Sequence, residues 1–332
     1  MEDFDYYLKF NENIPDSKFI DNFIQNKKTE FNKNSLFDLL ISKYKTNIKL
    51  YEEIILFIRI FIKTFINGHG FKRAEIFIKK NNKDFFNINS QMNNFDYIFF
   101  RLKNKFDKLM LGRFYNKISL KEKNLDGNFI YFPAPFQPEA DNTPNAGIYS
   151  NLIYTLKIIS KYLPENISIV YKEHPATFMF KNNLYGTLIK NRKFYKELLK
   201  IKNLKLVSSD INSQNLIKKS ICTITVCGSA SLEALIIGKP SILFGNTYFK
   251  SCSEIFHIKK NNDLKIFFSK ILTGYKPNIH KVKYFLMNLY KYSFYIEDHI
   301  NNKYYDEYSK LIQKNNLKTS ELIYRSINEY YT

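Results

Sequence analysis

The stretch CTITVCGSASLEALIIGKPSILFG, residues 222–245, decides the fold of this chain. It starts with CTITV, whose β-branched residues predict a buried strand, and continues into a turn of glycine, serine and alanine. SLEALII at 231–237 has helical character and is ended by Gly238. SILFG at 241–245 is the next apolar strand. A strand, a helix and a strand joined by such short connections predict two parallel strands of one sheet.

The same alternation runs outward from this unit through the second half of the chain. Its other predicted strands are FIYFP, ISIVYK and NLKLVSS, at residues 129–133, 167–172 and 203–209, and its helices lie at 149–163 and 213–220. Strands that alternate with helices wind into a parallel sheet. We therefore expect the α/β class, with a Rossmann-like parallel sheet in the C-terminal half.

The N-terminal 126 residues follow a different pattern. Helical periodicity is found near residues 17–26, 35–45, 49–66 and 95–118, and a short strand near 73–80 is an open alternative. We expect a mainly helical domain over residues 1–126. A Rossmann-like domain over residues 127–332 follows it and ends in further helices from residue 261 onward.

The chain is strongly basic: its 332 residues carry 51 Lys and Arg against 31 Asp and Glu, a formal net charge of +20. Abundant Lys, Asn and Ile beside an absence of Trp indicate a compositional bias of an AT-rich genome. Part of the basicity therefore carries no functional meaning. The charge still favours polyanions, anionic membrane surfaces and phosphorylated substrates. The hydrophobic content of 45% excludes a disordered chain.

The cysteines and the apolar segments indicate the compartment. Cys222, Cys227 and Cys252 form neither a disulfide framework nor a metal pattern. Cys222 and Cys227 flank a predicted buried strand and are expected as small core residues, consistent with a reducing cytoplasm. The acidic N-terminus lacks the apolar segment of a signal peptide. The apolar stretch 50–68 contains four charged residues, which predicts a buried amphipathic helix, with an interfacial helix as the alternative.

Three unusual segments each follow a predicted strand. The loop 134–148 follows the strand FIYFP, Glu173-His174-Pro175 follows ISIVYK, and the turn 228–231 follows CTITV. Because parallel strands place their ligand loops at one edge of the sheet, we expect these segments to converge on a single site.

The turn Gly228-Ser229-Ala230-Ser231 precedes a helix. Backbone N–H groups, the helix dipole and two hydroxyls can hold a phosphate there. Ser229 or Ser231 could instead simply cap the helix. Glu233, in the first helical turn, has two interpretations, a contact to a ribose hydroxyl or an ordinary acid that complements the dipole.

His174 lies between a strand and Pro175, which holds its backbone extended. An imidazole at this place can bind a phosphate oxygen or protonate a leaving group, and a structural histidine is the alternative. Lys172 and Glu173 precede it. Glu173 either orients the imidazole or is solvated, and Lys172 is a candidate ligand of an anionic substrate.

Glu139 and Asp141 are the acids of the loop 134–148. A glycosyl transfer needs a carboxylate that acts as a base or a nucleophile. Asp141 opens a turn-forming Asp-Asn-Thr-Pro sequence, which suits a capping role. We therefore rank Glu139 first as the catalytic acid.

The motifs together resemble a known family. FPAPFQPEADNTPNAG, then VYKEHPA, then TVCGSASLEALIIGKPSILFG are similar, in matching order over residues 128–250, to bacterial capsule and surface-polysaccharide biosynthesis proteins that include Kdo transferases. The resemblance implies a GT-B-like architecture with the donor in the C-terminal Rossmann-like half. The N-terminal part would then lie on the acceptor side.

The resemblance also implies residue roles. In relatives that use CMP-activated sugars, the His-Pro step and the serine-containing turn bind the cytidylate phosphate. Those roles fall here on His174, Pro175, Ser229 and Ser231, and the catalytic carboxylate would be Glu139 or Asp141. Where the family commonly has threonines after QPEA, this chain has Asp141-Asn142-Thr143. That departure leaves the choice of acid, and the sugar, open.

The predicted function is a cytoplasmic glycosyltransferase of capsule or lipopolysaccharide biosynthesis, peripheral at the inner face of the membrane. It would transfer Kdo or a related acidic sugar from a CMP-linked donor to a glycan or glycolipid, with no cofactor and no metal. A nucleotide-sugar epimerase of similar fold is one alternative. A nucleic-acid-binding protein is another, which the charge favours but no binding motif supports.

Overall fold

The computed structural model describes residues 17–30, 55, 58–59, 61–62, 94–137, 142–178 and 189–292. By contacts the chain divides into two units, one of residues 1–25 with 280–332 and one of residues 26–279. The domain boundary expected at residues 126–127 stays a prediction.

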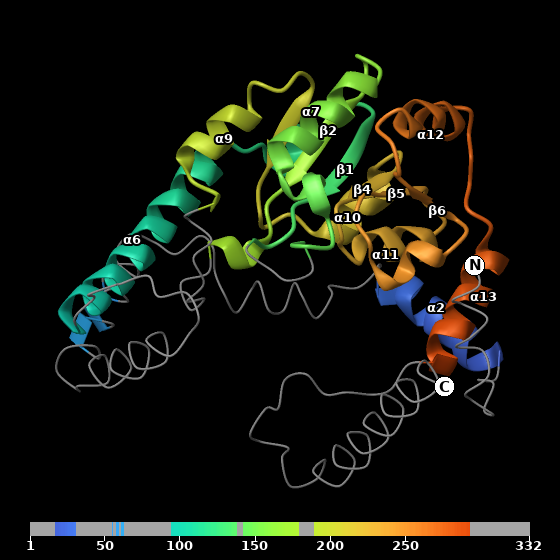
Figure 1. The fold of residues 1–332 in the computed structure, drawn as a ribbon, viewed down its shortest axis with the longest axis horizontal. Helices are drawn as coiled ribbons and strands as arrows, with labels where there is room; N and C mark the ends of the chain where they lie inside the picture. The colour runs from blue at the N-terminus through green and yellow to red at the C-terminus, as the bar shows by residue number, and fades with distance from the viewer. Residues whose placement is uncertain are drawn as a thin grey trace, which may run out of the picture. The chain divides into compact units, whose positions relative to one another are not determined.

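A six-stranded parallel sheet is the centre of the larger unit (Figure 1). Its strands are β1 Phe129–Pro133, β2 Ser168–Lys172, β3 Leu204–Val207, β4 Thr223–Thr225, β5 Ser241–Leu243 and β6 Ile255–His257. Every pairing is parallel, and the order is β3-β2-β1-β4-β5-β6. This is the strand order of a Rossmann fold. The expected α/β class and Rossmann-like sheet are therefore confirmed.

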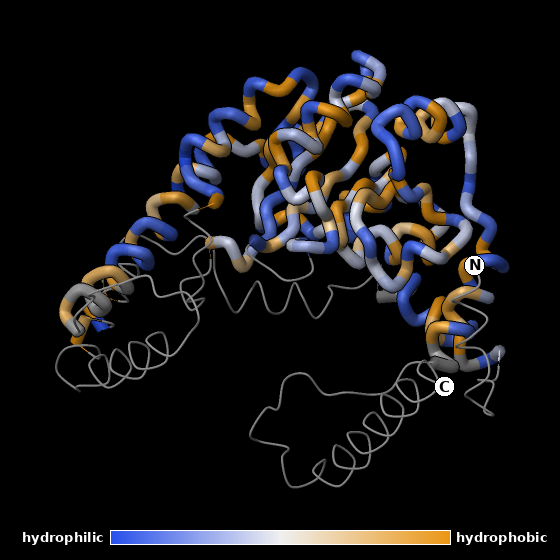
Figure 2. The backbone as a smooth tube through the Cα atoms, viewed as in Figure 1, coloured by the Kyte–Doolittle hydropathy of each residue, from blue (hydrophilic) through white to orange (hydrophobic). Residues whose placement is uncertain are grey.

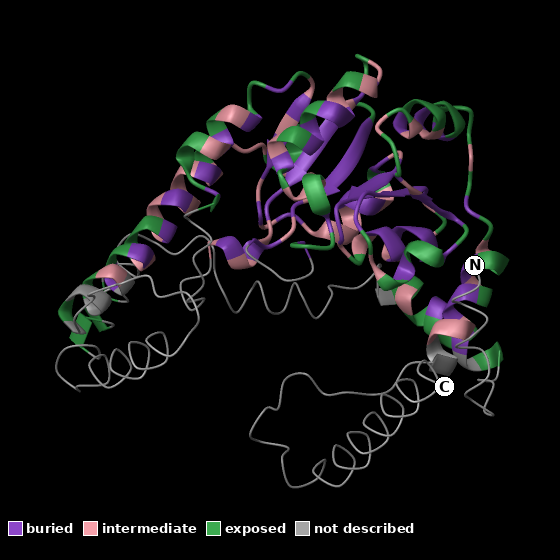
Figure 3. Cartoon of the chain, in the orientation of Figure 1, coloured by how far each residue is buried: buried purple, intermediate pink, exposed green. Residues whose placement is uncertain are grey.

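Helices cover both faces of this sheet. The described helices are α2 Ser17–Glu30, α6 Asn94–Ile118, α7 Leu152–Tyr162, α9 Arg192–Leu198, α10 Ser213–Lys219, α11 Ala230–Ile236, α12 Asp263–Leu272 and α13 Ile279–Tyr292, with short 3-10 turns η1 Glu122–Asn124, η2 Gly147–Ser150, η3 Pro175–Thr177 and η4 Tyr248–Ser251. α7, α9 and α12 contribute to the core on one face, while α10 and α11 pack on the other. Strands buried on both faces read as continuous apolar runs, as they do here (Figures 2 and 3).

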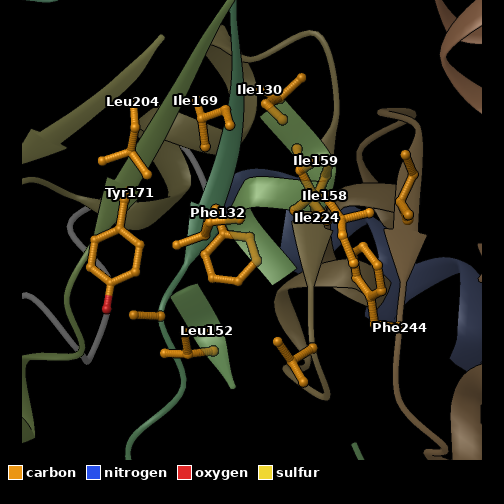
Figure 4. Packing of buried hydrophobic residues seen from close by; sticks show 14 of the residues in the cluster. Ile130, Phe132, Leu152, Ile158, Ile159, Ile169, Tyr171, Leu204, Ile224 and Phe244 are labelled. Carbon is orange, nitrogen blue, oxygen red and sulfur yellow. The ribbon is translucent and has the colours of Figure 1, made fainter. Parts of the chain in front are cut away.

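The larger core lies between β1–β5 and the helices α7, α9 and α12. Figure 4 shows Phe132, Tyr171 and Ile169 among this cluster, with Leu152 and Ile159 of α7. The rings of Phe132 and Tyr171 stack with centroids 5.9 Å apart. At about 25 cal/mol per Å² of apolar surface, this burial is the main favourable term in folding.

Two described elements were not expected. β6 spans Ile255–His257, where the sequence has only two consecutive apolar residues between Glu254 and His257. α9 lies in a Lys-rich stretch and buries only Tyr195 and Leu198. Within the predicted helix 50–68, the described residues 55, 58, 59, 61 and 62 are helical. Their exposed fractions include 46% for Ile55 and 48% for Phe61, so the predicted burial is not found at these positions.

The smaller unit joins the two ends of the chain. Lys283 of α13 forms an ion pair with Asp21 of α2 at 2.7 Å. Ile20, Val282 and Phe285 are buried in this unit.

Two further observations concern the apolar segments and the cysteines. None of the helices in the described ranges is long and apolar enough to cross a bilayer. All three cysteines are buried and free, which confirms the prediction that Cys222 and Cys227 are small core residues.

Candidate active site

The strand order places the reversal point of the sheet between β1 and β4. β1 pairs with β2 through Pro133 and Lys172, and with β4 through Tyr131 and Thr223. In open α/β sheets, ligands bind outside the carboxyl ends of the strands at such a switch point. The loops that follow β1, β2 and β4 meet at this edge, and these are the loops that carry the three sequence motifs.

The loop after β1 is fixed to the sheet at both ends. Its first residue, Ala134, donates its N–H to the Lys172 carbonyl oxygen at 2.9 Å, and the Gln137 amide donates to the Ser150 carbonyl oxygen at 2.8 Å. Near its end the Asn145 carbonyl oxygen accepts the N–H of Asn246 at 2.9 Å. Residues 138–141, and with them Glu139 and Asp141, lie outside the described residues.

Gly245, two residues after the end of β5, permits this close approach. A Cβ atom there would overlap the Cys227 sulfur, and would lie 2.8 Å from the Val226 carbonyl oxygen and 3.2 Å from that of Asn145. Only a glycine therefore lets the β1 loop lie against the ends of β4 and β5.

His174 follows β2 as the N-terminal cap of η3, with Pro175 in the first position of that turn. Its Nδ1 accepts the N–H of Ala176 at 3.2 Å, and its ring lies 5.8 Å from that of Phe136 in the β1 loop. Burial lowers the pKa of His174 to about 4; the Glu173 carboxylate opposes this shift, and the ammonium groups of Lys190 and Lys172 add to it. At neutral pH the imidazole is therefore uncharged.

The tautomer of this imidazole follows from its contact. Because Nδ1 accepts a hydrogen bond, the single proton of the neutral ring is assigned to Nε2. Such a ring donates a hydrogen bond to a phosphate oxygen. It is poorly suited to protonating a leaving group near neutral pH, because so little of it is charged.

The sequence suggested that Glu173 either orients the imidazole or is solvated. The structure shows neither. The Glu173 side chain is fully buried and forms an ion pair with Lys190 at 2.7 Å. The hydroxyls of Tyr171 and Tyr195 donate to it at 2.8 Å. Burial by itself would raise the pKa of Glu173, but the Lys190 ammonium and these hydroxyls hold the pKa below its ordinary value. Glu173 contacts the backbone N–H of His174, at 2.9 Å.

Lys172 points to the opposite face of the sheet from Glu173. It is 2% exposed, and its ammonium donates to the Ser213 hydroxyl at the start of α10 at 2.7 Å. The Lys172 ammonium is therefore buried near the carboxyl ends of the strands and is not exposed to solvent.

The turn after β4 separates the two candidate serines. Ser229 is exposed and its hydroxyl donates to Glu233 at 3.1 Å. Burial raises the pKa of the Glu233 carboxyl, and the Ser229 hydroxyl and Lys27 ammonium oppose that shift. Ser231 is fully buried, with its hydroxyl 2.6 Å from that of Thr225. Of the two hydroxyls, that of Ser229 is placed to meet a ligand.

The fold thus brings His174, Gly228, Ser229 and Glu233 to one edge, while Lys172 and Ser231 are used in packing. Reasoning from the sequence missed Lys190 and Tyr195, the partners of Glu173. Neither belongs to a motif, and both come from a segment with no functional signal.

Comparison with known proteins gives one family. Residues 140–295 match the model of the family described as capsule polysaccharide biosynthesis protein. The resemblance expected from the motifs is thereby confirmed for this stretch. Asp141, His174 and the turn 228–231 lie inside it, and Glu139 lies one residue outside. No curated protein matches the chain.

Several solved structures are similar to parts of this chain. The beta Kdo 2,7 transferase KpsC of Thermosulfurimonas dismutans is 19% identical with a TM-score of 0.32, over 58% of this chain and 66% of that one. The UDP-GlcNAc 2-epimerase of Methanocaldococcus jannaschii is 16% identical with a TM-score of 0.33, over 60% and 52% of the two chains. The chain therefore spans less than two thirds of the length of these proteins.

Proposed function

We propose that this protein is a glycosyltransferase of capsule or lipopolysaccharide biosynthesis that uses a CMP-activated donor and has a GT-B architecture. The proposed sugar is Kdo or a related acidic sugar, and the acceptor is a glycan or glycolipid. One observation supports this most strongly: the stretch that matches the capsule family carries His174 and the turn 228–231, which lie at the switch point of a Rossmann-like sheet.

In this proposal the donor phosphate lies between the loop after β2 and the turn after β4. Nε2–H of His174 and the backbone N–H groups of the turn donate hydrogen bonds to phosphate oxygens. The Ser229 hydroxyl, which has a single proton, turns from Glu233 to the phosphate when the donor binds. Glu233, half-buried beside Ser229, accepts from a ribose hydroxyl. Pro175 stiffens the His174 turn, and Gly228 keeps the turn after β4 free of a side chain.

The proposed transfer breaks the bond between the anomeric carbon and the phosphate oxygen, and the electron pair leaves with CMP. The acceptor hydroxyl oxygen forms the new bond, and its proton passes to a carboxylate of the β1 loop, Glu139 or Asp141. The hydrogen bond from His174 stabilises the charge that develops on the leaving phosphate. The proposal needs no metal and no cofactor besides the nucleotide sugar.

A thermal-shift series with CMP, UDP and GDP tests the donor. A ligand at 100 times its dissociation constant stabilises a protein by about 2.7 kcal/mol, so the nucleotides are easily ranked. We expect CMP to give the largest shift. A larger shift with UDP than with CMP would contradict the CMP assignment and leave the site itself intact.

Product analysis tests the reaction class. Incubation with a CMP-linked acidic sugar should release CMP in proportion to acceptor, with a new glycosidic product. An altered nucleotide sugar formed equally with and without acceptor would indicate an epimerase instead.

We also propose that the protein acts at the cytoplasmic face of an anionic membrane, where a charge of +20 is attracted to acidic lipid headgroups. Co-sedimentation with vesicles of phosphatidylglycerol and phosphatidylcholine tests this. We expect binding to the anionic vesicles alone, and its loss at high salt.

A further inference from the structure

We infer that the buried pair Lys190 and Glu173 is a positioning device that holds the β1 loop and the His174 turn in one mutual arrangement. The inference rests on the proposed function, because it concerns how the residues of that site are placed. Neither Lys190 nor Glu173 is proposed to touch the substrate.

A single ammonium group connects the two loops. Nζ of Lys190 lies 2.7 Å from Oε1 of Glu173 and 2.5 Å from the carbonyl oxygen of Pro135. Pro135 is the second residue of the loop that leads to Glu139 and Asp141, and Glu173 directly precedes His174. The side chains of Lys190 and Glu173 are both 0% exposed, so water does not screen the attraction between their charges.

The carboxylate of Glu173 in turn fixes the His174 turn. It accepts the backbone N–H of His174 at 2.9 Å and the Thr177 hydroxyl at 3.0 Å, one at each side of Pro175. The backbone N–H of Glu173 donates to the Tyr115 hydroxyl at 3.0 Å, and that hydroxyl donates to the Val207 carbonyl oxygen at 2.8 Å. The turn is thereby tied to α6 and to β3 as well.

Stability alone does not account for this pair. Burying two charges is expensive, and well-packed apolar side chains often give equal or greater stability in the same place. An apolar pair could not donate a hydrogen bond to the backbone of another loop, as the Lys190 ammonium does to the Pro135 carbonyl oxygen. A site that transfers a group needs such fixed geometry, since a shift of about 1 Å can cost roughly 100-fold in rate.

Four variants test the inference. Lys190→Met and Glu173→Gln each remove one charge, and the double variant removes both, so that no unpaired charge is left to prevent folding. Lys239→Met is the matched control. Its ammonium also donates to a carbonyl oxygen, that of Ser220 at 2.9 Å, but at the edge where β4 and β5 begin.

The kinetic readout is the dissociation constant of CMP together with kcat and KM for transfer, in variants that circular dichroism shows to be folded. We expect the double variant to lose about 100-fold in kcat and about 10-fold in CMP affinity, because the acid-bearing loop loses more of its anchoring than the His174 turn does. Lys239→Met should stay within about twofold of the parent protein for both quantities. A folded double variant with parental kcat and CMP affinity would overturn the inference.

A second readout needs no substrate. The imidazole of His174 is followed by NMR as pH is lowered, with its resonances identified by their absence in His174→Gln. Glu173, Lys190 and Lys172 are the charged groups that act on this ring. Lys190→Met removes a cation that lowers the pKa of His174 and should raise that pKa, whereas Glu173→Gln removes a carboxylate that raises it and should lower it.

The two readouts separate the failure of this inference from that of the proposed function. If the parent protein neither binds a nucleotide nor transfers a sugar, the proposed function fails, and the NMR measurement still judges whether the pair acts on His174. An imidazole whose resonances and pKa are unchanged in the folded double variant, and in Lys190→Met where it folds, would refute the positioning role whatever the activity.

Discussion

Nδ1 of His174 accepts a hydrogen bond from the backbone N–H of Ala176 at 3.2 Å. This contact turns the neutral imidazole into a donor directed through Nε2, and it does so with a backbone group that does not titrate. The ring is thus prepared to meet an anion without itself carrying charge.

His174→Ala is expected to weaken CMP binding as well as turnover, because a phosphate contact exists in both the ground state and the transition state. A hydrogen bond to a charged group contributes about 1.5–3 kcal/mol, which corresponds to a roughly 10- to 100-fold loss of affinity. Calorimetric titration of CMP into the folded variant measures it. Unchanged affinity would remove His174 from the site.

Stability should depend on pH through the same ring. The pKa of His174 falls from 6.5 to about 4 on folding, so the unfolded chain binds a proton that the folded chain does not. Its contribution is complete above about pH 6.5 and is lost as pH falls toward 4, by at most roughly 3 kcal/mol. Urea unfolding at several pH values should show a steeper loss for the parent protein than for His174→Ala. Parallel curves would mean that the ring is not buried as described.

The two serines of the turn after β4 should respond differently. Ser229→Asp places a carboxylate at the exposed position beside Glu233 and should abolish CMP binding through like-charge repulsion with the phosphate. Ser231→Ala removes a buried hydroxyl 2.6 Å from that of Thr225 and should cost about 1 kcal/mol of stability with little change in affinity. Isothermal titration and thermal unfolding of both variants check this pair. Normal CMP binding by Ser229→Asp would exclude the turn as the phosphate site.

Glu139→Gln keeps the shape of the side chain and removes its charge. If Glu139 is the catalytic carboxylate, donor binding should survive while turnover falls about 10²- to 10⁴-fold. Asp141→Asn is the control and should disturb the loop only modestly. Sugar transfer and CMP affinity are measured for both. An inactive Asp141→Asn beside an active Glu139→Gln would exchange the two roles, and full activity of both would leave the loop with a structural role only.

Gly245→Ala should destabilise the protein by about 1–3 kcal/mol, since its methyl group would press on the Cys227 sulfur and on the Val226 carbonyl oxygen at 2.8 Å. Gly112→Ala in α6 is the control. Its Cβ would lie 3.5 Å from Phe178, an ordinary contact, and alanine favours a helix by about 0.5–1 kcal/mol. Thermal unfolding of the two variants should therefore shift in opposite directions.

The sequence predicted most of the sheet because five of its six strands lie within a distinct run of apolar or β-branched residues. The β-branched run before Gly228 and the apolar run before His174 were sufficient to place β4 and β2, and the convergence of their loops on one edge followed from parallel pairing. β6 was missed because its apolar run, Ile255-Phe256 between Glu254 and His257, is shorter than the apolar runs that contain β4 and β5.

The surroundings of the site could not be read in the same way. Glu173 follows a strand and looks like a loop acid, yet its partners Tyr115, Lys190 and Tyr195 lie 58, 17 and 22 residues away along the chain. Ser231 looks equivalent to Ser229 as a donor to phosphate. Only the way in which α11 packs on β4 shows that one faces Thr225 and the other faces solvent.

The attachment of the β1 loop has a consequence for how its chemistry can be altered. Lys190 holds the loop at Pro135, and Asn246 holds it at Asn145, so the loop is anchored at these two residues. An insertion or deletion between Pro135 and Asn145 would therefore shift Glu139 and Asp141 relative to these anchored residues. Natural diversification or laboratory redesign of this segment is therefore best achieved by exchanging side chains at constant length. A library of variants should keep the number of residues between Pro135 and Asn145 unchanged and vary the residue types at the positions between them.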